Sequence, residues 1–70
     1  MTIKEFISKM DKTTFESCEI WTNGGDDEGS TILLSRGHIY PGQVKLMEKE
    51  IKEFSIDPNN DEVFEFYIQT

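Results

Sequence analysis

The stretch Glu62-Val63-Phe64-Glu65-Phe66-Tyr67-Ile68-Gln69 shows the most regular alternation of large apolar and other side chains in the chain. Successive side chains of a β-strand point to opposite faces of the sheet. The alternation therefore predicts a strand over 62–69 that buries Phe64, Phe66 and Ile68. Val63, Glu65, Tyr67 and Gln69 are then expected on the opposite face.

Two earlier segments show the same period of two. Residues 15–22 place Phe15, Ser17, Glu19 and Trp21 on one side and Glu16, Cys18, Ile20 and Thr22 on the other, which predicts a strand. Residues 30–35 predict a second strand, with Ile32 and Leu34 on one face and Thr31 and Leu33 on the other. Residues 23–29 contain three glycines and no apolar residue, and they are expected to form a surface loop between two antiparallel strands.

Helical signals occur at the start and in the middle of the chain. Thr2-Ile3-Lys4-Glu5 has the form of a capping box, and Ile3, Phe6, Ile7 and Met10 follow at helical spacing, so we expect a helix that ends near Asp11. Arg36-Gly37 and Pro41-Gly42 are typical of turns. We place a short helix at about 43–49, a strand at about 50–57 and a turn at 57–61.

Together these elements predict a single domain over residues 1–70 of the α+β class. An N-terminal helix packs on a mostly antiparallel sheet of about four strands, with a short second helix at about 43–49. Cys18, Ile20, Ile32 and Leu34 are expected to face the helix, together with Phe54, Ile56 and the buried face of 62–69.

The composition limits the classes of function. Seven basic and fourteen acidic residues give a net charge of −7, and seven of the acids lie in residues 48–70. Such a surface repels nucleic-acid backbones and anionic membranes, so no direct binding to either is expected, whereas it attracts a basic protein. The single cysteine and the lack of a signal-peptide or membrane-spanning run indicate a soluble protein of the cytoplasm.

The motifs of catalysis and cofactor binding are missing from the sequence. There is no nucleotide-binding glycine motif, and one His with one Cys cannot form a structural zinc site, so no enzyme activity, cofactor or metal is expected. His38 is expected at the surface or a sheet edge, and Cys18 in the core. The Asp26-Asp27-Glu28 cluster has three interpretations: a solvated loop, a macromolecular contact or a weak cation site. A deep pocket lined by two or more acids would favour an enzyme.

A partner-binding surface is expected on the sheet face that the helix leaves open. Strand alternation places Trp21, Leu33, Val63 and Tyr67 there, among carboxylates, and exposed aromatic residues often dominate binding energy. The alternative is that residues 36–49 fold over this face. The acids form either a solvated outer surface or a negative row that imitates a phosphate backbone. The candidate partner-binding residues are Trp21, Asp26, Asp27, Glu28, Leu33, Glu48, Glu53, Asp61, Glu62, Glu65 and Tyr67.

The opening Met-Thr-Ile-Lys-Glu-Phe-Ile, the later Glu-Ile-Lys-Glu-Phe-Ser-Ile-Asp and the closing Glu-Val-Phe-Glu-Phe-Tyr-Ile resemble small uncharacterised phage and prophage proteins of low-GC Gram-positive bacteria. The resemblance is one of general character and not of a shared motif. It covers about a third of the chain, and no functional residue can be assigned from it. It implies a context in which small acidic proteins block host enzymes, as anti-CRISPR proteins do when they occupy DNA-binding channels.

The sequence thus favours a non-catalytic protein-binding module, a phage or mobile-element inhibitor acting in the host cytoplasm. Its expected partner is a basic host protein, such as a nuclease or another nucleic-acid-binding protein. The alternative is a structural homo-oligomer, for example a homodimer, that pairs through the open sheet face or an edge strand.

Overall fold

The computed structural model describes residues 1–23, 29–57 and 63–70. In this part of the chain, two α-helices, one 3₁₀ helix and five strands follow one another. Their order is α1 (Ile3–Ser8), α2 (Lys12–Ser17), β1 (Cys18–Thr22), β2 (Thr31–Ser35), β3 (His38–Ile39), η1 (Pro41–Glu48), β4 (Glu53–Asp57) and β5 (Phe64–Gln69).

The five strands form one sheet in the order β3-β2-β1-β5-β4. All neighbouring strands are antiparallel except β1 and β5, which run parallel at the centre. The α+β class and the N-terminal helix are confirmed, although the sheet has five strands and is mixed. The predicted helix at 43–49 is the 3₁₀ helix η1. The predicted turns at 23–29 and 57–61 lie largely outside the described residues.

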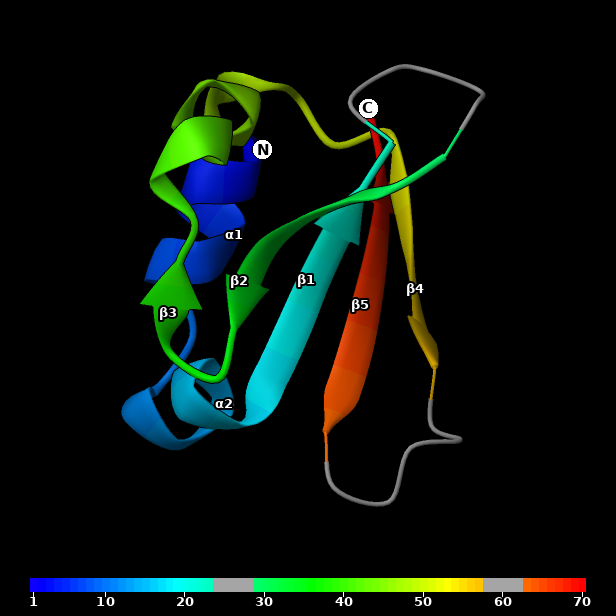
Figure 1. Ribbon diagram of the computed structural model, residues 1–70. Coiled ribbons are helices and arrows are strands. Elements are labelled where there is room, and N and C mark those ends of the chain that lie inside the picture. Colours follow the sequence, from blue (N-terminus) through cyan, green and yellow to red (C-terminus); the bar gives the residue numbers. More distant parts are fainter. Residues whose placement is uncertain (24–28, 58–62) are drawn as a thin grey trace.

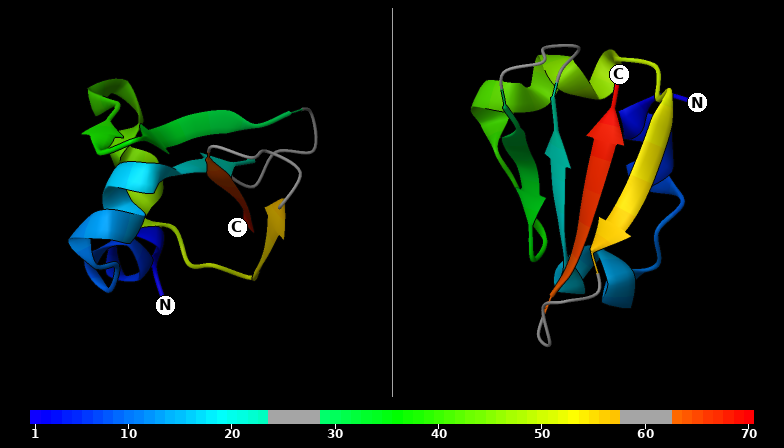
Figure 2. Two further views of the ribbon diagram at one scale, coloured as in Figure 1. Left: turned by 90° about the horizontal axis from the view of Figure 1, so that it is seen from below. Right: turned by 90° about the vertical axis from the view of Figure 1, so that its right-hand side faces the viewer.

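The helices lie together on one side of the sheet (Figure 1). Seen from the opposite side, β2, β1, β5 and β4 stand in front, with α1 and η1 behind them (Figure 2, right). η1 contacts α1 and β2, and its Met47 is buried in the core. Residues 41–48 therefore pack on the helix side, and they do not cover the open side of the sheet.

The N-terminal helix starts as its sequence predicts. The Thr2 hydroxyl accepts a hydrogen bond from the Glu5 amide at 3.1 Å, and the Glu5 carboxylate accepts one from the Thr2 amide at 3.1 Å. The pKa of Glu5 is lowered, because its carboxylate accepts from the Thr2 amide and also from the Thr2 hydroxyl, and both bonds favour its charged form. The helix ends at Ser8, earlier than expected, and Ile3 is its buried residue.

The strand predicted over 15–22 is wrong in its first three residues. Asp11 caps a second helix, since its carboxylate accepts a hydrogen bond from the Thr14 amide at 2.7 Å. Residues 15–17 complete this helix, and β1 begins directly after it at Cys18. The period of two in 15–17 is too short to outweigh a satisfied helix cap.

A β-bulge in β2 corrects the predicted position of Leu33. Ile20 pairs with Leu34, but the next residue, Trp21, pairs with Ile32, so Leu33 is the extra residue. Leu33 and Leu34 are both fully buried in the core. The bulge shifts the alternation by one residue, and it moves Ile32 to the side of Trp21. Leu33 is therefore not a surface residue, and Ile32 is not a helix-facing one.

The core is centred on β1 and β2, and the helices cover it only in part. Its buried members are Ile3, Cys18, Ile20, Leu33, Leu34, Met47 and Ile68. Toward β4, the aromatic contacts of the described residues come from Phe6, whose ring centroid lies 5.4 Å from that of Phe54 and 5.5 Å from that of Phe66. The expected burial of Phe54, Ile56 and Phe64 is wrong, since these side chains are 52%, 51% and 58% exposed. Val63, expected outside, is buried, one residue before β5 begins.

Cys18 and His38 lie where their sequence context predicts. Cys18 is buried, its Sγ lies 3.9 Å from the Met10 Sδ, and burial raises the pKa of its thiol. His38 is exposed on the edge strand β3, with its ring edge-on to Tyr40 at a centroid distance of 4.8 Å. The structure therefore gives both residues a packing role.

The bulge makes a testable prediction about two adjacent residues. Leu33→Ala removes a buried side chain and is expected to lower the free energy of unfolding by about 2–5 kcal/mol. Ile32→Ala, on a half-exposed residue, is expected to cost about 1 kcal/mol. Urea unfolding followed by the fluorescence of the single tryptophan measures both. A cost for Ile32→Ala equal to or above that of Leu33→Ala would show that the bulge is misplaced.

Candidate functional site

The candidate site is the sheet face that points away from the helices, which we call the open face. Paired residues of neighbouring strands point to the same side of a sheet, so the strand registers define which residues share this face. Its members are Glu19, Trp21, Ile32, Ser35, His38, Glu53, Ser55, Asp57, Glu65, Tyr67 and Gln69.

Three carboxylates occupy one level of the open face on three adjacent strands. Glu19 of β1 pairs with Glu65 of β5, and Glu65 pairs with Asp57 of β4. Neighbouring strands lie about 4.8 Å apart, so the backbone positions of these acids follow one another at that spacing. We call Glu19, Glu65 and Asp57 the carboxylate row. Glu53 adds a fourth acid at the far end of β4.

A second level of the open face carries the aromatic residues. Trp21 of β1 pairs with Tyr67 of β5, with Ile32 of β2 beside Trp21 and Ser55 of β4 beside Tyr67. Trp21, Ile32 and Tyr67 are half-buried, because neighbours at this level pack side by side and shield one another. The open face thus combines an aromatic row with an adjacent row of negative charge.

Each aromatic side chain is tied to a carboxylate on its own strand. The Trp21 Nε1 donates a hydrogen bond to Glu19 at 3.2 Å, and the Tyr67 hydroxyl donates one to Glu65 at 2.7 Å. The Ser35 hydroxyl donates a further bond to Glu19 at 3.3 Å. These neutral donors fix the positions of the two glutamates, and they leave the negative charges uncancelled.

The pKa of the Tyr67 hydroxyl is affected by the negative charges of the carboxylate row. Its pKa is raised, first because its hydroxyl donates to Glu65 and then because burial and the negative charges of Glu65, Asp57 and Glu19 disfavour a tyrosinate. All three members of the row therefore act on this one hydroxyl. Each of the three carboxylates thus lies within electrostatic range of the Tyr67 hydroxyl.

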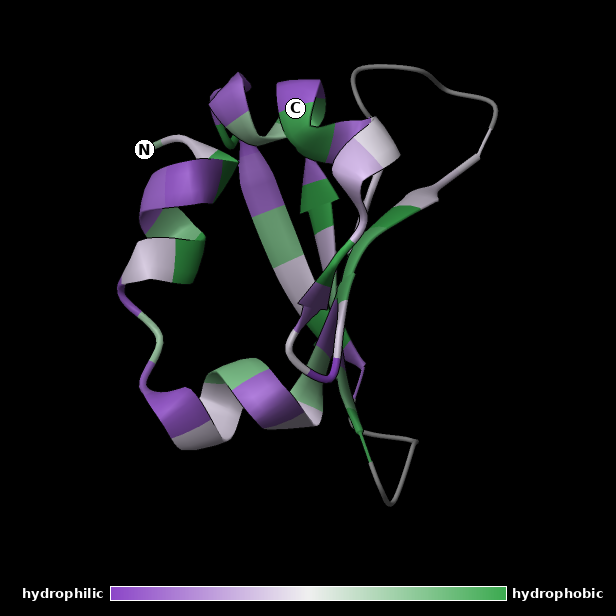
Figure 3. Ribbon diagram, turned by 60° about the vertical axis from the view of Figure 1, so that its left-hand side comes forward, coloured by the Kyte–Doolittle hydropathy of each residue, from purple (hydrophilic) through white to green (hydrophobic). Residues whose placement is uncertain are grey.

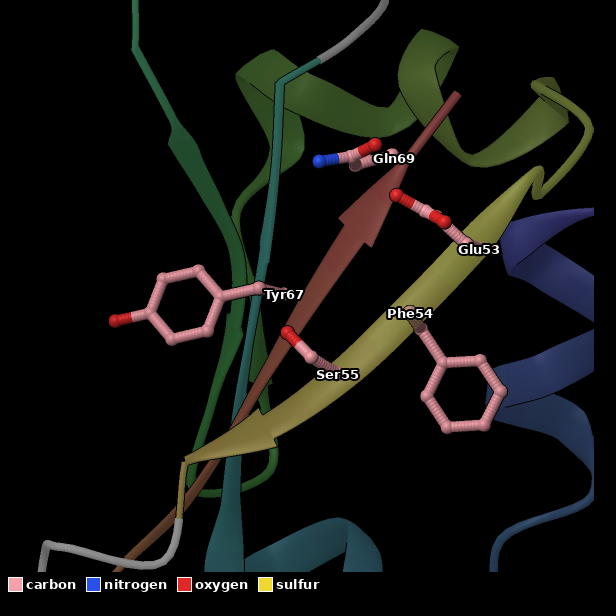
Figure 4. Close-up of a pocket in the computed structure, with 5 residues that line it drawn as sticks. All are labelled: Glu53, Phe54, Ser55, Tyr67 and Gln69. Carbon is pink, nitrogen blue, oxygen red and sulfur yellow. The ribbon is translucent and has the colours of Figure 1, made fainter.

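A hollow of about 230 Å³ lies over β4 and β5, lined by Glu53, Phe54, Ser55, Tyr67 and Gln69. Figure 4 shows Tyr67 and Ser55 pointing to one side of these strands, while Phe54 points to the other side, toward α1. One carboxylate, one hydroxyl, one amide and an aromatic ring thus surround the hollow. Such a set suits the cationic end of a Lys or Arg side chain, through charge-assisted hydrogen bonds and cation–π contact.

The structure brings four of the predicted partner-binding residues together, namely Trp21, Tyr67, Glu65 and Glu53. Leu33 is excluded because it is buried. Glu48 is exposed but lies on η1, among the helices. The remaining candidates, Asp26, Asp27, Glu28, Asp61 and Glu62, lie outside the described residues.

Seven residues of the open face were not among the predicted site residues: Glu19, Ile32, Ser35, His38, Ser55, Asp57 and Gln69. Glu19 and Asp57 had a usable signal, since Glu19 shares the alternation of Trp21 and Asp57 shares that of Glu53. Ile32 had none, because a bulge leaves no mark in the hydrophobic pattern. Ser35 had the same signal as Glu19, because the alternation that points Leu34 inward points Ser35 outward.

Within residues 1–23, 29–57 and 63–70, no group of His, Cys, Asp and Glu side chains is placed to hold a metal ion. The helices of the same residues are too short and too polar to cross a membrane. Comparisons of the chain with known protein families, with curated proteins and with solved structures find no match. The site is therefore assigned from its own chemistry.

The field of the carboxylate row predicts a high pKa for Tyr67. In a Tyr40→Phe variant, Tyr67 is the one remaining tyrosine, and the ultraviolet absorbance of its tyrosinate is expected to appear with a midpoint above pH 10.0. Adding Glu65→Gln is expected to lower that midpoint, because the largest cause of the shift is removed. Circular dichroism at each pH checks that the protein is folded.

The sign of the effect on stability follows from the same shift. A phenol whose pKa is raised by folding stabilises the native state fully below pH 10, and this contribution is lost as the pH rises through the folded value. Equal midpoints in the variants with and without Glu65→Gln, while both are folded, would contradict the predicted contact between Glu65 and Tyr67.

Proposed function

We propose that this chain is a non-catalytic protein-binding module whose open face engages a basic surface of another protein. The observation that carries the proposal is the pairing of Glu19 with Glu65, two like charges side by side at the centre of the sheet. Like charges side by side on neighbouring strands destabilise a sheet. A local conflict of this kind is typical of functional sites, where stability is given up for binding.

The rest of the open face supports the same kind of partner. Its strand positions carry the acids Glu19, Glu53, Asp57 and Glu65 and no Lys or Arg. Trp21 and Tyr67 lie beside these acids as rigid aromatic groups that gain from being fully desolvated. A partner with Lys or Arg around an apolar centre would neutralise the row and cover both rings. The net charge of −7 would accelerate such an encounter.

Inhibition of a nucleic-acid-binding protein is the form of this function that we favour. The carboxylate row offers anions at intervals of about 4.8 Å along the sheet, on a chain with a strong negative excess. A groove that binds phosphates through Lys and Arg can accept such a row in place of nucleic acid. The phage or mobile-element context comes only from the resemblance of the sequence.

Affinity capture with matched charge variants tests the proposal. Immobilised protein is incubated with bacterial lysate, and the captured proteins are compared for the native chain, Glu19→Gln/Glu65→Gln and Glu16→Gln/Glu48→Gln. Both double variants remove two negative charges, but Glu16 and Glu48 are exposed on the helices. The expected result is a basic protein that the native chain and the helix variant retain and the open-face variant loses.

The captured complex should also depend on charge and exclude nucleic acid. Binding is expected to weaken strongly in about 1 M salt, where the Debye length falls to about 3 Å. Double-stranded DNA or RNA should compete if the partner uses the same groove for nucleic acid. Equal retention by the two double variants, or capture that neither salt nor nucleic acid alters, would refute the proposal. A stable homodimer in sedimentation that shields Trp21 would instead support the structural oligomer.

A further inference from the structure

Among the strands that the structure describes, β4 is the last of the sheet and pairs with one neighbour. β4 is hydrogen-bonded to β5, and it is the terminal strand in the order of the described sheet. In Figure 1 it forms the outer edge on the side opposite β3. The backbone N–H and C=O groups of a strand point alternately to its two sides, so half of those of β4 are directed away from β5.

The two faces of β4 have opposite chemical character. Phe54 and Ile56 lie on the helix side and are 52% and 51% exposed, while Glu53, Ser55 and Asp57 lie on the open face. In Figure 3 the strand that follows the grey loop, β2, carries an uninterrupted hydrophobic run, Ile32-Leu33-Leu34, whereas hydrophilic and hydrophobic residues follow one another in β4. On the helix side, a second hollow of about 400 Å³ lies beside Phe54, lined also by Met1, Phe6, Lys9, Met10 and Phe66. The edge therefore offers apolar contacts on one face and acidic contacts on the other.

We infer that β4 binds an extended segment of the partner by strand addition, and that this segment alternates apolar with basic residues. An added strand pairs with the outward backbone groups of β4 and places its side chains alternately on the two faces. Its apolar side chains cover Phe54 and Ile56, and its Lys or Arg side chains lie opposite Glu53 and Asp57. The hollow at Glu53 and Tyr67 lies within one strand of that position.

A second copy of the chain fits this edge poorly. In a continuous sheet formed by two β4 strands with their helix sides aligned, residues 53, 55 and 57 of one copy face those of the other. A two-fold axis at Ser55 would place Glu53 opposite Asp57 twice. Like charges directly opposite are destabilising, and each copy adds a net charge of −7. The same acids that repel a second copy attract a basic strand.

The inference deepens the proposed function, because it takes the basic partner from there and states which part of the partner binds and how. The probe is the capped peptide Lys-Val-Lys-Val-Lys-Val-Lys. Lys-Lys-Lys-Lys-Val-Val-Val has the same composition without the alternation, and Glu-Val-Glu-Val-Glu-Val-Glu has the alternation with the opposite charge. Binding is followed by amide NMR and by hydrogen exchange of the native chain.

The decisive measurement is the rate of hydrogen exchange of the β4 backbone amides. Without peptide, alternate amides of β4 are expected to exchange fast, since they face solvent and not β5. The alternating Lys-Val peptide should slow these amides at least about tenfold at saturation, because it hydrogen-bonds them. Peptides that are N-methylated on every second residue provide a further check. One of the two methylated series should lose binding and the other should keep it, since a strand turns only half of its N–H groups toward a neighbour.

Variants of β4 separate its two faces. Ile56→Thr and Glu53→Gln should each weaken binding of the Lys-Val peptide about threefold, through a lost apolar pair and a lost ion pair. Phe64→Thr is the matched control, because Phe64 is 58% exposed on the same helix side but belongs to β5. It should leave the affinity unchanged.

The outcomes distinguish this inference from the proposed function. If the peptide binds through the open face alone, Glu19→Gln/Glu65→Gln abolishes binding and the fast amides of β4 stay fast, so strand addition fails while the proposed function stands. If the amides of β4 are protected but the captured partner binds the native chain and Glu19→Gln/Glu65→Gln equally, strand addition stands and the proposed function fails. Three results would overturn strand addition. The two Lys-Val sequences bind equally, or neither of them binds. Alternatively, the outward amides of β4 are already protected by a second copy in the protein without peptide.

Discussion

The parallel pairing of β1 with β5 joins two distant parts of the chain in five consecutive residue pairs. On the helix side, these pairs align the buried Cys18, Ile20 and Ile68 with their neighbours and so position the core. On the open side, the same register sets Glu19 beside Glu65 and Trp21 beside Tyr67. One backbone interaction therefore determines both the stability of the molecule and the composition of its candidate binding surface.

The conflict on the open face is a direct result of this register. The segments Glu19-Ile20-Trp21 and Glu65-Phe66-Tyr67 follow the same order of acid, apolar and aromatic residue. Parallel strands in this register place like beside like, whereas an antiparallel pair centred on Ile20 and Phe66 would set each acid opposite an aromatic ring. The Trp21 and Tyr67 donors reduce the cost by holding the two carboxylates. They supply no positive charge, so a cationic group from outside remains the most favourable neighbour.

Local signals in the sequence predicted the elements that depend on local chemistry. The capping box at Thr2 and Glu5, the buried position of Cys18 and the division of β4 and β5 into two faces are found in the structure. The expected burial of Phe54, Ile56 and Phe64 was wrong, because all three are exposed. Trp21, Tyr67, Glu65 and Glu53 were assigned to the correct face because alternation is reliable within one regular strand. Leu33 was assigned to the wrong face, since the bulge depends on pairing with β1. The parallel order of β1 and β5 was missed for the same reason, because the period of a strand does not reveal its neighbours.

The two edges of the sheet differ in a way that the hydrophobic effect alone does not explain. β3 has two residues, and a strand of that length offers few backbone groups for pairing with another chain. β4 is longer and keeps Phe54 and Ile56 half exposed. Its acids lie only on the open face, so they block self-pairing without removing the apolar contacts on the other face. An edge that served only to resist aggregation would carry charge on both faces. Because β4 carries charge on one face alone, it is better explained as an edge that admits a basic strand than as an edge that excludes every strand.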